Sequence, residues 1–222
     1  NKNLETATFP SADPEQAFRM SEGKSHHTLV DAIWGYTQFE LDKPTKRMLV
    51  VCAKSGLYEP QRMPFGPAPA PAHMQSYVHT KFGSLVDSKG ERFVSPCMDD
   101  LKISSRTLDE HIEHVGLLCK AAREVGFEFK WKKSQLNWPE IEFWGCICDG
   151  SGRRMLPKKV RQLEEWPEPT TTEAVVSFLC FVSYLREFLP PDWLEHERVL
   201  SVFRKKDASF SNWAKDEKYV KV

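Results

Sequence analysis

The stretch Ser95-Pro96-Cys97-Met98-Asp99-Asp100-Leu101-Lys102-Ile103-Ser104 decides how the rest of the chain is interpreted. Its two adjacent carboxylates, Asp99 and Asp100, lie between short segments of β-forming residues, 92–97 and 101–105. Because aspartate favours turns, the pattern predicts a β-hairpin with an acidic tip. Two interpretations are open for the pair alone: a solubilised turn, or a site for a hard divalent cation such as Mg²⁺. A third carboxylate from elsewhere in the chain would favour the cation.

The composition is that of an ordinary globular protein. The 222 residues, 41% hydrophobic and 28% charged, suffice for one sizeable core, alone or with a small appended subdomain. The 31 basic residues equal the 31 acidic residues, so any basic surface for a nucleic acid must be local. No apolar run approaches the roughly 18 residues of a membrane span, and residues 1–25 lack a signal-peptide core. We therefore expect an intracellular protein without a membrane partner, and, since it opens on Asn1 rather than Met, part of a longer polypeptide.

The cysteines and histidines do not form a recognisable metal motif. The six cysteines, at 52, 97, 119, 146, 148 and 180, contain no CxxC pair, which favours reduced thiols over a disulfide framework. His111 and His114 are three residues apart on a predicted helix, with no ligand partners evident nearby. We expect a surface role for both histidines rather than a zinc site.

Two apolar segments of the first half predict strands. Residues 26–33 form the first, and Asp31 within it is costly unless it is paired, bound to a metal or exposed at a strand end. Residues 46–53 form a nearly continuous apolar run, as expected for a buried strand. The loop 62–72, rich in Pro, Ala and Gly, then leads into a helix. It is either a rigid connector or a place where a ligand approaches the backbone.

The second half begins with the clearest helix signal of the chain. Thr107 and Glu110 form a capping box, apolar residues recur at helical spacing from Ile112 to Val125, and Gly126 provides a stop. Alternating strands follow, and from residue 153 the chain becomes helical and basic. We predict an α+β fold with an antiparallel sheet and packed helices at residues 1–152, and a small helical subdomain at 153–203. A final segment, 204–222, is charged.

The predicted β-α-β-β-α-β order places Asp31 and the Asp99-Asp100 pair as in a polymerase palm. Here the sequence resembles, nearly end to end, the reverse transcriptase of gypsy-type LTR retrotransposons. The matching blocks include Asp31-Ala32-Ile33-Trp34-Gly35-Tyr36-Thr37-Gln38, Gly56-Leu57-Tyr58-Glu59, Met63-Pro64-Phe65-Gly66, Ala70-Pro71-Ala72, Cys97-Met98-Asp99-Asp100, Lys132-Lys133, Phe143-Trp144-Gly145 and Trp166-Pro167-Glu168-Pro169. Each block is weak alone, and their order makes the resemblance specific. It implies fingers remnant and palm at 1–152, thumb at 153–203 and the start of the connection segment at 204–222.

The resemblance implies nucleotidyl transfer at two Mg²⁺ ions, with Mn²⁺ as the alternative, from a deoxynucleoside triphosphate (dNTP) to a DNA primer on an RNA template. Asp31, Asp99 and Asp100 would be catalytic and hold the metals, Asp100 less directly. The other residues implied are Tyr36, Phe65, Gly66, Ala70, Pro71 and Gln75 for the substrate, Trp144 and Gly145 for the primer grip, and Lys132, Lys133, Arg153, Arg154, Lys158 and Lys159 for nucleic-acid phosphates. The implied location is the cytoplasm, a virus-like particle or the nucleus.

The chain departs from the family pattern at several positions. Cys97, preceded by Pro96, replaces the usual aromatic residue before the Asp-Asp pair, residues 67–69 read Pro-Ala-Pro instead of Leu-Thr-Asn, and Trp144 replaces a leucine. The first fingers strands, ribonuclease H and integrase are expected outside this stretch, so the chain on its own is expected to be a poor polymerase.

Two function classes stay open. One is the polymerase of a retroelement polyprotein. The other is a non-catalytic subunit derived from a reverse transcriptase that binds other parts of the polyprotein or a host complex. Retention of all three aspartates favours the enzyme.

Overall fold

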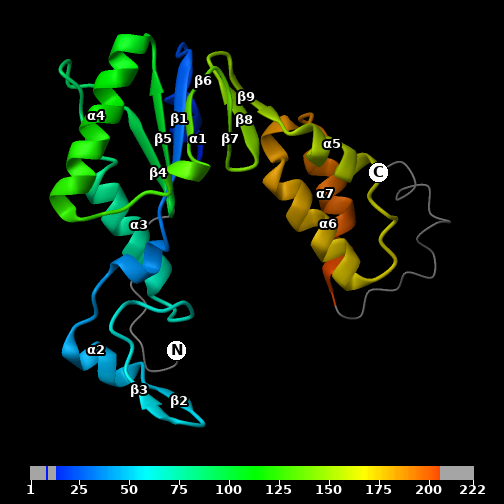
Figure 1. The fold of residues 1–222 in the computed structure, drawn as a ribbon. Coiled ribbons are helices and arrows are strands. Elements are labelled where there is room, and N and C mark those ends of the chain that lie inside the picture. The colour runs from blue at the N-terminus through cyan, green and yellow to red at the C-terminus, as the bar shows by residue number, and fades with distance from the viewer. Residues whose placement is uncertain (1–8, 10–13, 206–222) are drawn as a thin grey trace. The chain divides into compact units, whose positions relative to one another are not determined.

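The computed structural model describes residue 9 and residues 14–205 (Figure 1). Its contacts divide the chain into two compact units, residues 1–153 and residues 154–222, which are treated separately below. Of the predicted connection segment, residues 206–222 lie outside the described part. No helix among the described residues is long and apolar enough to cross a membrane.

The first unit combines helices with an antiparallel sheet. Its strands are β1 (His26–Asp31), β2 (Val51–Ala53), β3 (Gly56–Tyr58), β4 (Val94–Cys97), β5 (Asp100–Ser105), β6 (Gln135–Trp138), β7 (Ile141–Phe143), β8 (Cys146–Asp149) and β9 (Gly152–Met155), the last of which runs across the unit boundary. Its helices are α1 (Pro14–Arg19), the 3₁₀ turn η1 (Gly35–Gln38), α2 (Lys43–Met48), α3 (Ala70–Lys81), α4 (Leu108–Val125) and the 3₁₀ turn η2 (Trp131–Lys133).

The main sheet has the strand order β4-β5-β1-β6, and its paired neighbours are antiparallel. Strand β1 pairs with β5 from His26 opposite Ser105 to Asp31 opposite Asp100. Two smaller sheets are the β2-β3 hairpin and β7-β8-β9. The predicted α+β class with an antiparallel sheet is confirmed.

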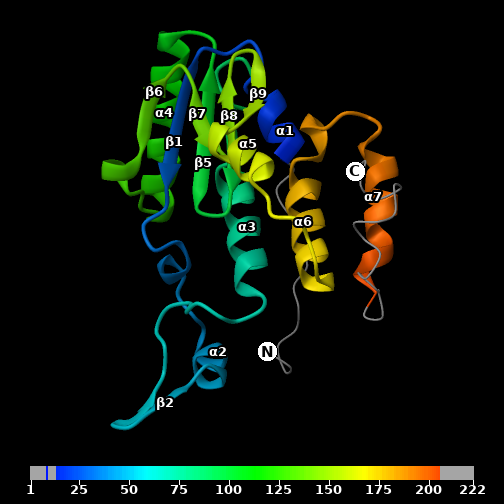
Figure 2. The same cartoon turned by 90° about the vertical axis from the view of Figure 1, so that its right-hand side faces the viewer.

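One face of the main sheet carries the hydrophobic core. Figures 1 and 2 show α3 and α4 lying over this sheet. Because side chains alternate along a strand, Leu101 and Ile103 of β5 both point to this face, and both are fully buried. They share one cluster with Met74 of α3 and Leu118 of α4. This packing stabilises the hairpin from which Asp99 and Asp100 project.

The opposite face of β5 holds a buried lysine. Lys102 is fully buried, and its ammonium donates to the carbonyl of Ala17 in α1 (2.5 Å) and to the hydroxyl of Ser21. The ammonium also lies 6.0 Å from the ring centroid of Phe18 and 5.3 Å from that of Phe143. Burial lowers the pKa of Lys102 to about 8. The segment around α1 is thereby attached to the centre of the sheet.

The predicted helix boundaries of α4 are confirmed. Thr107 caps its start, accepting a hydrogen bond from the Glu110 amide (3.3 Å), and Gly126 ends it in the left-handed conformation (φ 65°). The Glu110 carboxylate accepts from the Arg106 amide (3.1 Å), one residue before the cap.

The prediction of one buried strand over residues 46–53 was wrong. Asp42 caps a helix instead, accepting a hydrogen bond from the Thr45 amide (2.9 Å), with Pro44 in the first turn, so residues 43–48 are helical. Only Val51–Ala53 form a strand, and all three residues are exposed in the β2-β3 hairpin. The local capping signal prevailed over the apolar run.

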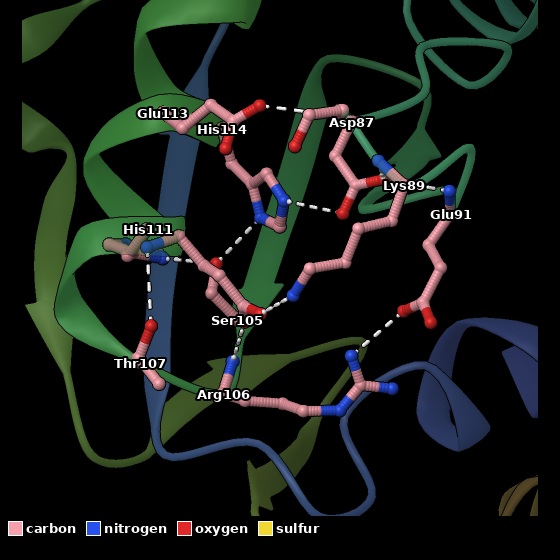
Figure 3. Close-up of polar contacts among 11 residues, drawn as sticks. Asp87, Lys89, Glu91, Ser105, Arg106, Thr107, His111, Glu113 and His114 are labelled. Atoms are coloured by element: carbon pink, nitrogen blue, oxygen red, sulfur yellow. Dashed lines mark hydrogen bonds and ion pairs between the residues drawn. The ribbon is translucent and has the colours of Figure 1, made fainter.

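The expectation of a surface role for His111 and His114 was also wrong, since both are buried, with 3% and 4% exposure. The hydroxyl of Ser105 lies 2.8 Å from Nδ1 of both rings (Figure 3). Nε2 of His114 faces the Asp87 carboxylate at 3.4 Å, and Nε2 of His111 lies 2.7 Å from the Thr28 hydroxyl. The five side chains form one chain of hydrogen bonds connecting β1, β5, α4 and the turn at Asp87.

The direction of these hydrogen bonds follows from Asp87, whose carboxylate only accepts. His114 therefore donates from Nε2 and accepts at Nδ1 from the Ser105 hydroxyl. Because that hydroxyl has one proton, His111 must donate from Nδ1 to Ser105 and accept at Nε2 from Thr28. Every group is satisfied when both histidines are neutral. A proton added to either histidine ring would place two hydrogen-bond donors opposite each other.

The second unit is helical. Its elements are α5 (Pro157–Glu164), α6 (Thr172–Tyr184), η3 (Arg186–Phe188), α7 (Trp193–Ser201) and η4 (Val202–Arg204). Val175 and Leu179 of α6 pack against Leu200 and Phe203 in a small core. This unit therefore has an apolar core of its own.

We expect the free energy of unfolding to fall as the pH is lowered from about 6.5 to about 4. Burial lowers the pKa of His27 to about 4, and that of His111 to about 4. Between these pH values the unfolded chain binds protons on both histidines while the folded chain does not, so both histidines favour unfolding in acid, and Asp100, whose pKa is raised to about 6, offsets only part of this effect. The expected loss is about 2–3 kcal/mol for each histidine, measured by chemical denaturation across this pH range.

A matched pair of variants isolates this effect. His111→Asn should reduce the stability at pH 7 and flatten the pH dependence, because one of the two histidines is gone. Replacement of the exposed His79 by Gln should leave the pH dependence unchanged. An unchanged slope in His111→Asn would contradict the assignment.

Candidate active site

The acidic turn connects β4 to β5 through Met98 and Asp99. Met98 has a left-handed backbone (φ 54°), and its amide donates to the side-chain oxygen of Gln75 in α3 at 2.7 Å. The amide nitrogen of Gln75 lies 3.5 Å from the carbonyl of Pro96. Gln75 is 4% exposed, so a buried side chain of α3 holds the end of β4 and the first residue of the turn in place.

Strand pairing brings the three predicted aspartates to one end of the sheet. Asp31 is the last residue of β1 and lies opposite Asp100, the first residue of β5. Directly after β1, the amide of Ala32 donates to the carbonyl of Asp99 at 2.7 Å. The predicted position of Asp31, beside the tip of the hairpin, is therefore confirmed.

The negative charges at this end of the sheet act on Asp100. Burial, together with the charges of Asp99 and Asp31, raises the pKa of Asp100 to about 6. A hard divalent cation prefers negatively charged oxygen ligands. The carboxylates of Asp31, Asp99 and Asp100 are ligands of this kind, so they fit such an ion. In the part of the chain that the structure describes, no three His, Cys, Asp or Glu side chains are arranged to hold a metal as they stand.

A pocket of about 230 Å³ opens beside Asp31 and Asp99. Tyr36 and Phe65 also line it, with their rings edge to face and their centroids 5.1 Å apart. Burial raises the pKa of the Tyr36 hydroxyl, as does the charge of Asp99. The pocket thus brings two carboxylates and an aromatic wall together.

Other predicted substrate residues do not line this pocket. Gly66 is exposed with φ 110°, Ala70 is buried and lines a neighbouring apolar pocket, and Pro71 follows it in the first turn of α3. The remaining predicted residues are Trp144 and Gly145 between β7 and β8, Lys132 and Lys133 exposed on η2, Arg153 and Arg154 on β9, and Lys158 and Lys159 on α5. None of these lines the pocket.

The pocket also contains residues that the sequence did not indicate. Lys130 lines it because its amide donates to the carbonyl of Asp31 at 2.7 Å, so the segment after α4 runs back beside β1. The alternation of Phe127, Phe129 and Trp131 could have placed Lys130 on the open side of this segment. Trp34 lines the pocket while 76% exposed, with a left-handed backbone (φ 47°), and no sequence signal indicated this position.

Residues 11–148 match the family described as "Reverse transcriptase (RNA-dependent DNA polymerase)". The chain belongs to the reverse transcriptase family. This reverse transcriptase is 25% identical over 190 residues to the Transposon Tf2-3 polyprotein of Schizosaccharomyces pombe, and equally to the Tf2-4 polyprotein. These alignments cover 86% of the chain but 14% of each polyprotein.

The fold is similar to that of solved reverse transcriptases. A foamy viral protease-reverse transcriptase in complex with an RNA/DNA hybrid superimposes with a TM-score of 0.78 at 19% identity, covering 94% of this chain and 28% of the viral chain. The same viral protein in complex with dsDNA gives a TM-score of 0.75 at 20% identity, covering 90% and 41%. Members of this family generally use divalent metal ions, in agreement with the donor set at Asp31 and Asp99.

We expect Gln75→Leu to loosen the acidic turn, because the Met98 amide is then without its acceptor. The amide of Met98 should exchange its hydrogen at least about tenfold faster, as measured by hydrogen-deuterium exchange at pH 7, since a decrease in protection of about 1.4 kcal/mol is a tenfold change. Gln61→Leu, at an exposed glutamine, serves as the control. Unchanged exchange at Met98 would show that Gln75 does not hold the turn.

Proposed function

We propose that this chain is the catalytic part of an RNA-directed DNA polymerase encoded by a retroelement polyprotein. One observation carries the proposal: strand register places Asp31 and Asp100 opposite each other and Asp99 beside them, next to a pocket lined by Tyr36. The proposed reaction joins the 3′-hydroxyl of a primer to the α-phosphorus of a dNTP and releases pyrophosphate.

The proposed partners are an RNA template, a DNA primer and a dNTP. The solved relatives in complex with an RNA/DNA hybrid and with dsDNA support the two nucleic acids. We further propose the gypsy-type subclass, on the ordered motifs from Asp31 to Trp166. The same proposal includes contacts with other parts of the polyprotein or with host proteins. It also includes a location in the cytoplasm, a virus-like particle or the nucleus.

The proposed metal site consists of Asp31 and Asp99, with Asp100 supporting them from its half-buried position. Two Mg²⁺ ions, with Mn²⁺ as the alternative, would supply an activated primer hydroxyl and charge stabilisation for the leaving pyrophosphate. The raised pKa of Asp100 beside the charges of Asp99 and Asp31 supports this assignment, because a divalent cation would neutralise the excess negative charge there.

The chain's own side chains would position the substrates. The ring of Tyr36, held against Phe65, would pack beneath the sugar of the incoming nucleotide, leaving no room for a 2′-hydroxyl. Gly66, Ala70, Pro71 and Gln75 are the further substrate residues that the resemblance implies, and among these Gln75 would act through the turn it holds. Trp144 and Gly145 would hold the primer end.

We assign the parts of the chain by the same reasoning. Residues 1–152 would be the fingers remnant and palm, 153–203 the thumb, and 204–222 the start of the connection. The separate core of Val175, Leu179, Leu200 and Phe203 supports a distinct thumb. The chain spans 14% of the transposon polyproteins it matches, so the activity of the whole protein is part of the proposal.

We expect Asp99→Asn in the full-length parent protein to reduce primer extension with Mg²⁺ by at least about 100-fold, because the substitution removes a charged ligand at the reacting phosphate. The measurement is incorporation of a labelled dNTP on a primed RNA template. Asp109→Asn, at an exposed aspartate of α4, serves as the control. Equal incorporation by Asp99→Asn and the unmodified protein would favour the non-catalytic subunit instead.

We expect Lys132→Gln combined with Lys133→Gln to weaken binding of a primer–template and to reduce its salt dependence. Both side chains lie on the exposed η2 turn, and the slope of log K against log salt should fall by about 0.9 for each phosphate that a lysine no longer neutralises. Fluorescence anisotropy between about 50 and 200 mM salt measures this slope. Lys120→Gln on α4 is the control, and an unchanged slope in the double variant would remove these lysines from the interface.

A further inference from the structure

The turn that follows β1, residues 33–38, carries the aromatic side of the pocket. It ends with η1, and both Trp34 and Tyr36 line the pocket beside Asp31. Trp34 has a left-handed backbone (φ 47°), which is unfavourable for a bulky residue and persists only where surrounding contacts hold it. The contacts that hold this turn therefore determine where the Tyr36 ring lies relative to Asp31.

The side-chain amide of Gln38, the last residue of the turn, makes three hydrogen bonds to the backbone. Its nitrogen donates to the carbonyl of Ile33 at 2.7 Å and to the carbonyl of Glu128 at 2.9 Å. Its oxygen accepts a hydrogen bond from the Glu128 amide at 2.8 Å. The bond to Ile33 closes the turn at its beginning, and the two bonds to Glu128 attach the turn to the segment that follows α4.

This segment after α4 is itself fixed beside the end of β1. The Lys130 amide donates to the carbonyl of Asp31 at 2.7 Å, and the Ile33 amide donates to the carbonyl of Glu128 at 3.0 Å. Phe129, between them, is 6% exposed and belongs to the hydrophobic core. The glutamine therefore joins the turn to a segment whose position relative to Asp31 is set by the core.

The turn is also seated closely on α3. A Cβ atom at Gly35 would clash with the side chain of Met74, which is 1% exposed and has no room to move away. The turn is thus blocked on the side of α3, and the amide of Gln38 holds it on the side of the segment after α4. Between these two constraints the Tyr36 ring faces Phe65 across the pocket.

We propose that Gln38 is a positioning residue for sugar selection, whose amide holds the turn so that the Tyr36 ring stays where a 2′-hydroxyl of the incoming nucleotide would lie. The inference rests on the proposed function and deepens the role given there to Tyr36. Gln38 does not line the pocket, so it acts through Tyr36 and not by touching the nucleotide.

An amide is the group that this position requires. A carboxylate in its place could not donate to the carbonyls of Ile33 and Glu128, and it would bring a negative charge against both. An apolar side chain would leave the two carbonyls and the Glu128 amide without this partner. Either change frees the turn on the side that Gln38 holds.

The test is a cycle of four full-length parent proteins: unmodified, Gln38→Met, Tyr36→Ala and the double variant. Methionine has a similar length and lacks the amide. The measured quantity is the ratio of kcat/KM for a dNTP to kcat/KM for the ribonucleotide with the same base. We expect Gln38→Met to lower this ratio at least about fivefold, and Tyr36→Ala to lower it at least as much. Adding Gln38→Met to Tyr36→Ala should change the ratio by less than about twofold, because the ring that Gln38 positions is already gone.

The ratio separates positioning from general stability. A smaller fraction of folded protein lowers both values of kcat/KM equally and leaves their ratio unchanged. Gln16→Met, at an exposed glutamine of α1, is the matched control and should keep the ratio of the unmodified protein. An unchanged ratio in Gln38→Met would overturn the proposal, and so would a double variant in which the two single effects multiply.

A second measurement does not depend on activity. The Thr37 amide donates to the Trp34 carbonyl at 2.8 Å within the turn, so its hydrogen-deuterium exchange reports how firmly the turn is held. Exchange at Thr37 should be at least about tenfold faster in Gln38→Met and unchanged in Gln16→Met. Equal exchange in Gln38→Met and the unmodified protein would overturn the proposal even in an active polymerase. Faster exchange together with a parent protein that extends no primer would instead overturn the proposed function.

Discussion

The pairing of β1 with β5 is the constraint on which the rest of the site depends. Its register places Asp31 opposite Asp100, and a shift by one residue would turn every side chain of one strand to the other face. The register is held from the core face, where Leu101 and Ile103 pack under α3 and α4. It is also held at the far end, where Ser105 is bonded to His111 and His114. Burial of apolar groups thus fixes where the charges lie.

Much of this arrangement could be predicted because it depends on local signals. Asp99 and Asp100 in a turn, Thr107 as a cap and Gly126 as a stop each act through the backbone of a few neighbouring residues. Asp31 needed an additional inference, since only the order of strands and helices brings it to the hairpin. The predicted β-α-β-β-α-β order matched that of a polymerase palm, and this likeness placed Asp31 beside the hairpin.

What could not be predicted depends on contacts between distant segments. The buried position of His111 and His114 requires Thr28 and Asp87, which lie 83 and 27 residues away from them. A histidine satisfied at both nitrogens in the core has the same sequence pattern as one on the surface. The run at 46–53 was misassigned for another reason. The cap at Asp42 stabilises a first helical turn at residues 43–48, and the apolar residues Val51–Ala53 stay exposed in a hairpin instead of forming a buried strand.

The ammonium of Lys102 has a consequence for the limits of the folding unit. Its two hydrogen-bond acceptors, the Ala17 carbonyl and the Ser21 hydroxyl, belong to the segment before β1. A shortened protein beginning at β1 would leave a positive charge enclosed beneath the sheet without either acceptor, which is costly. Residues 14–25 are therefore an integral part of the palm-like unit, and any autonomous version of it has to include them.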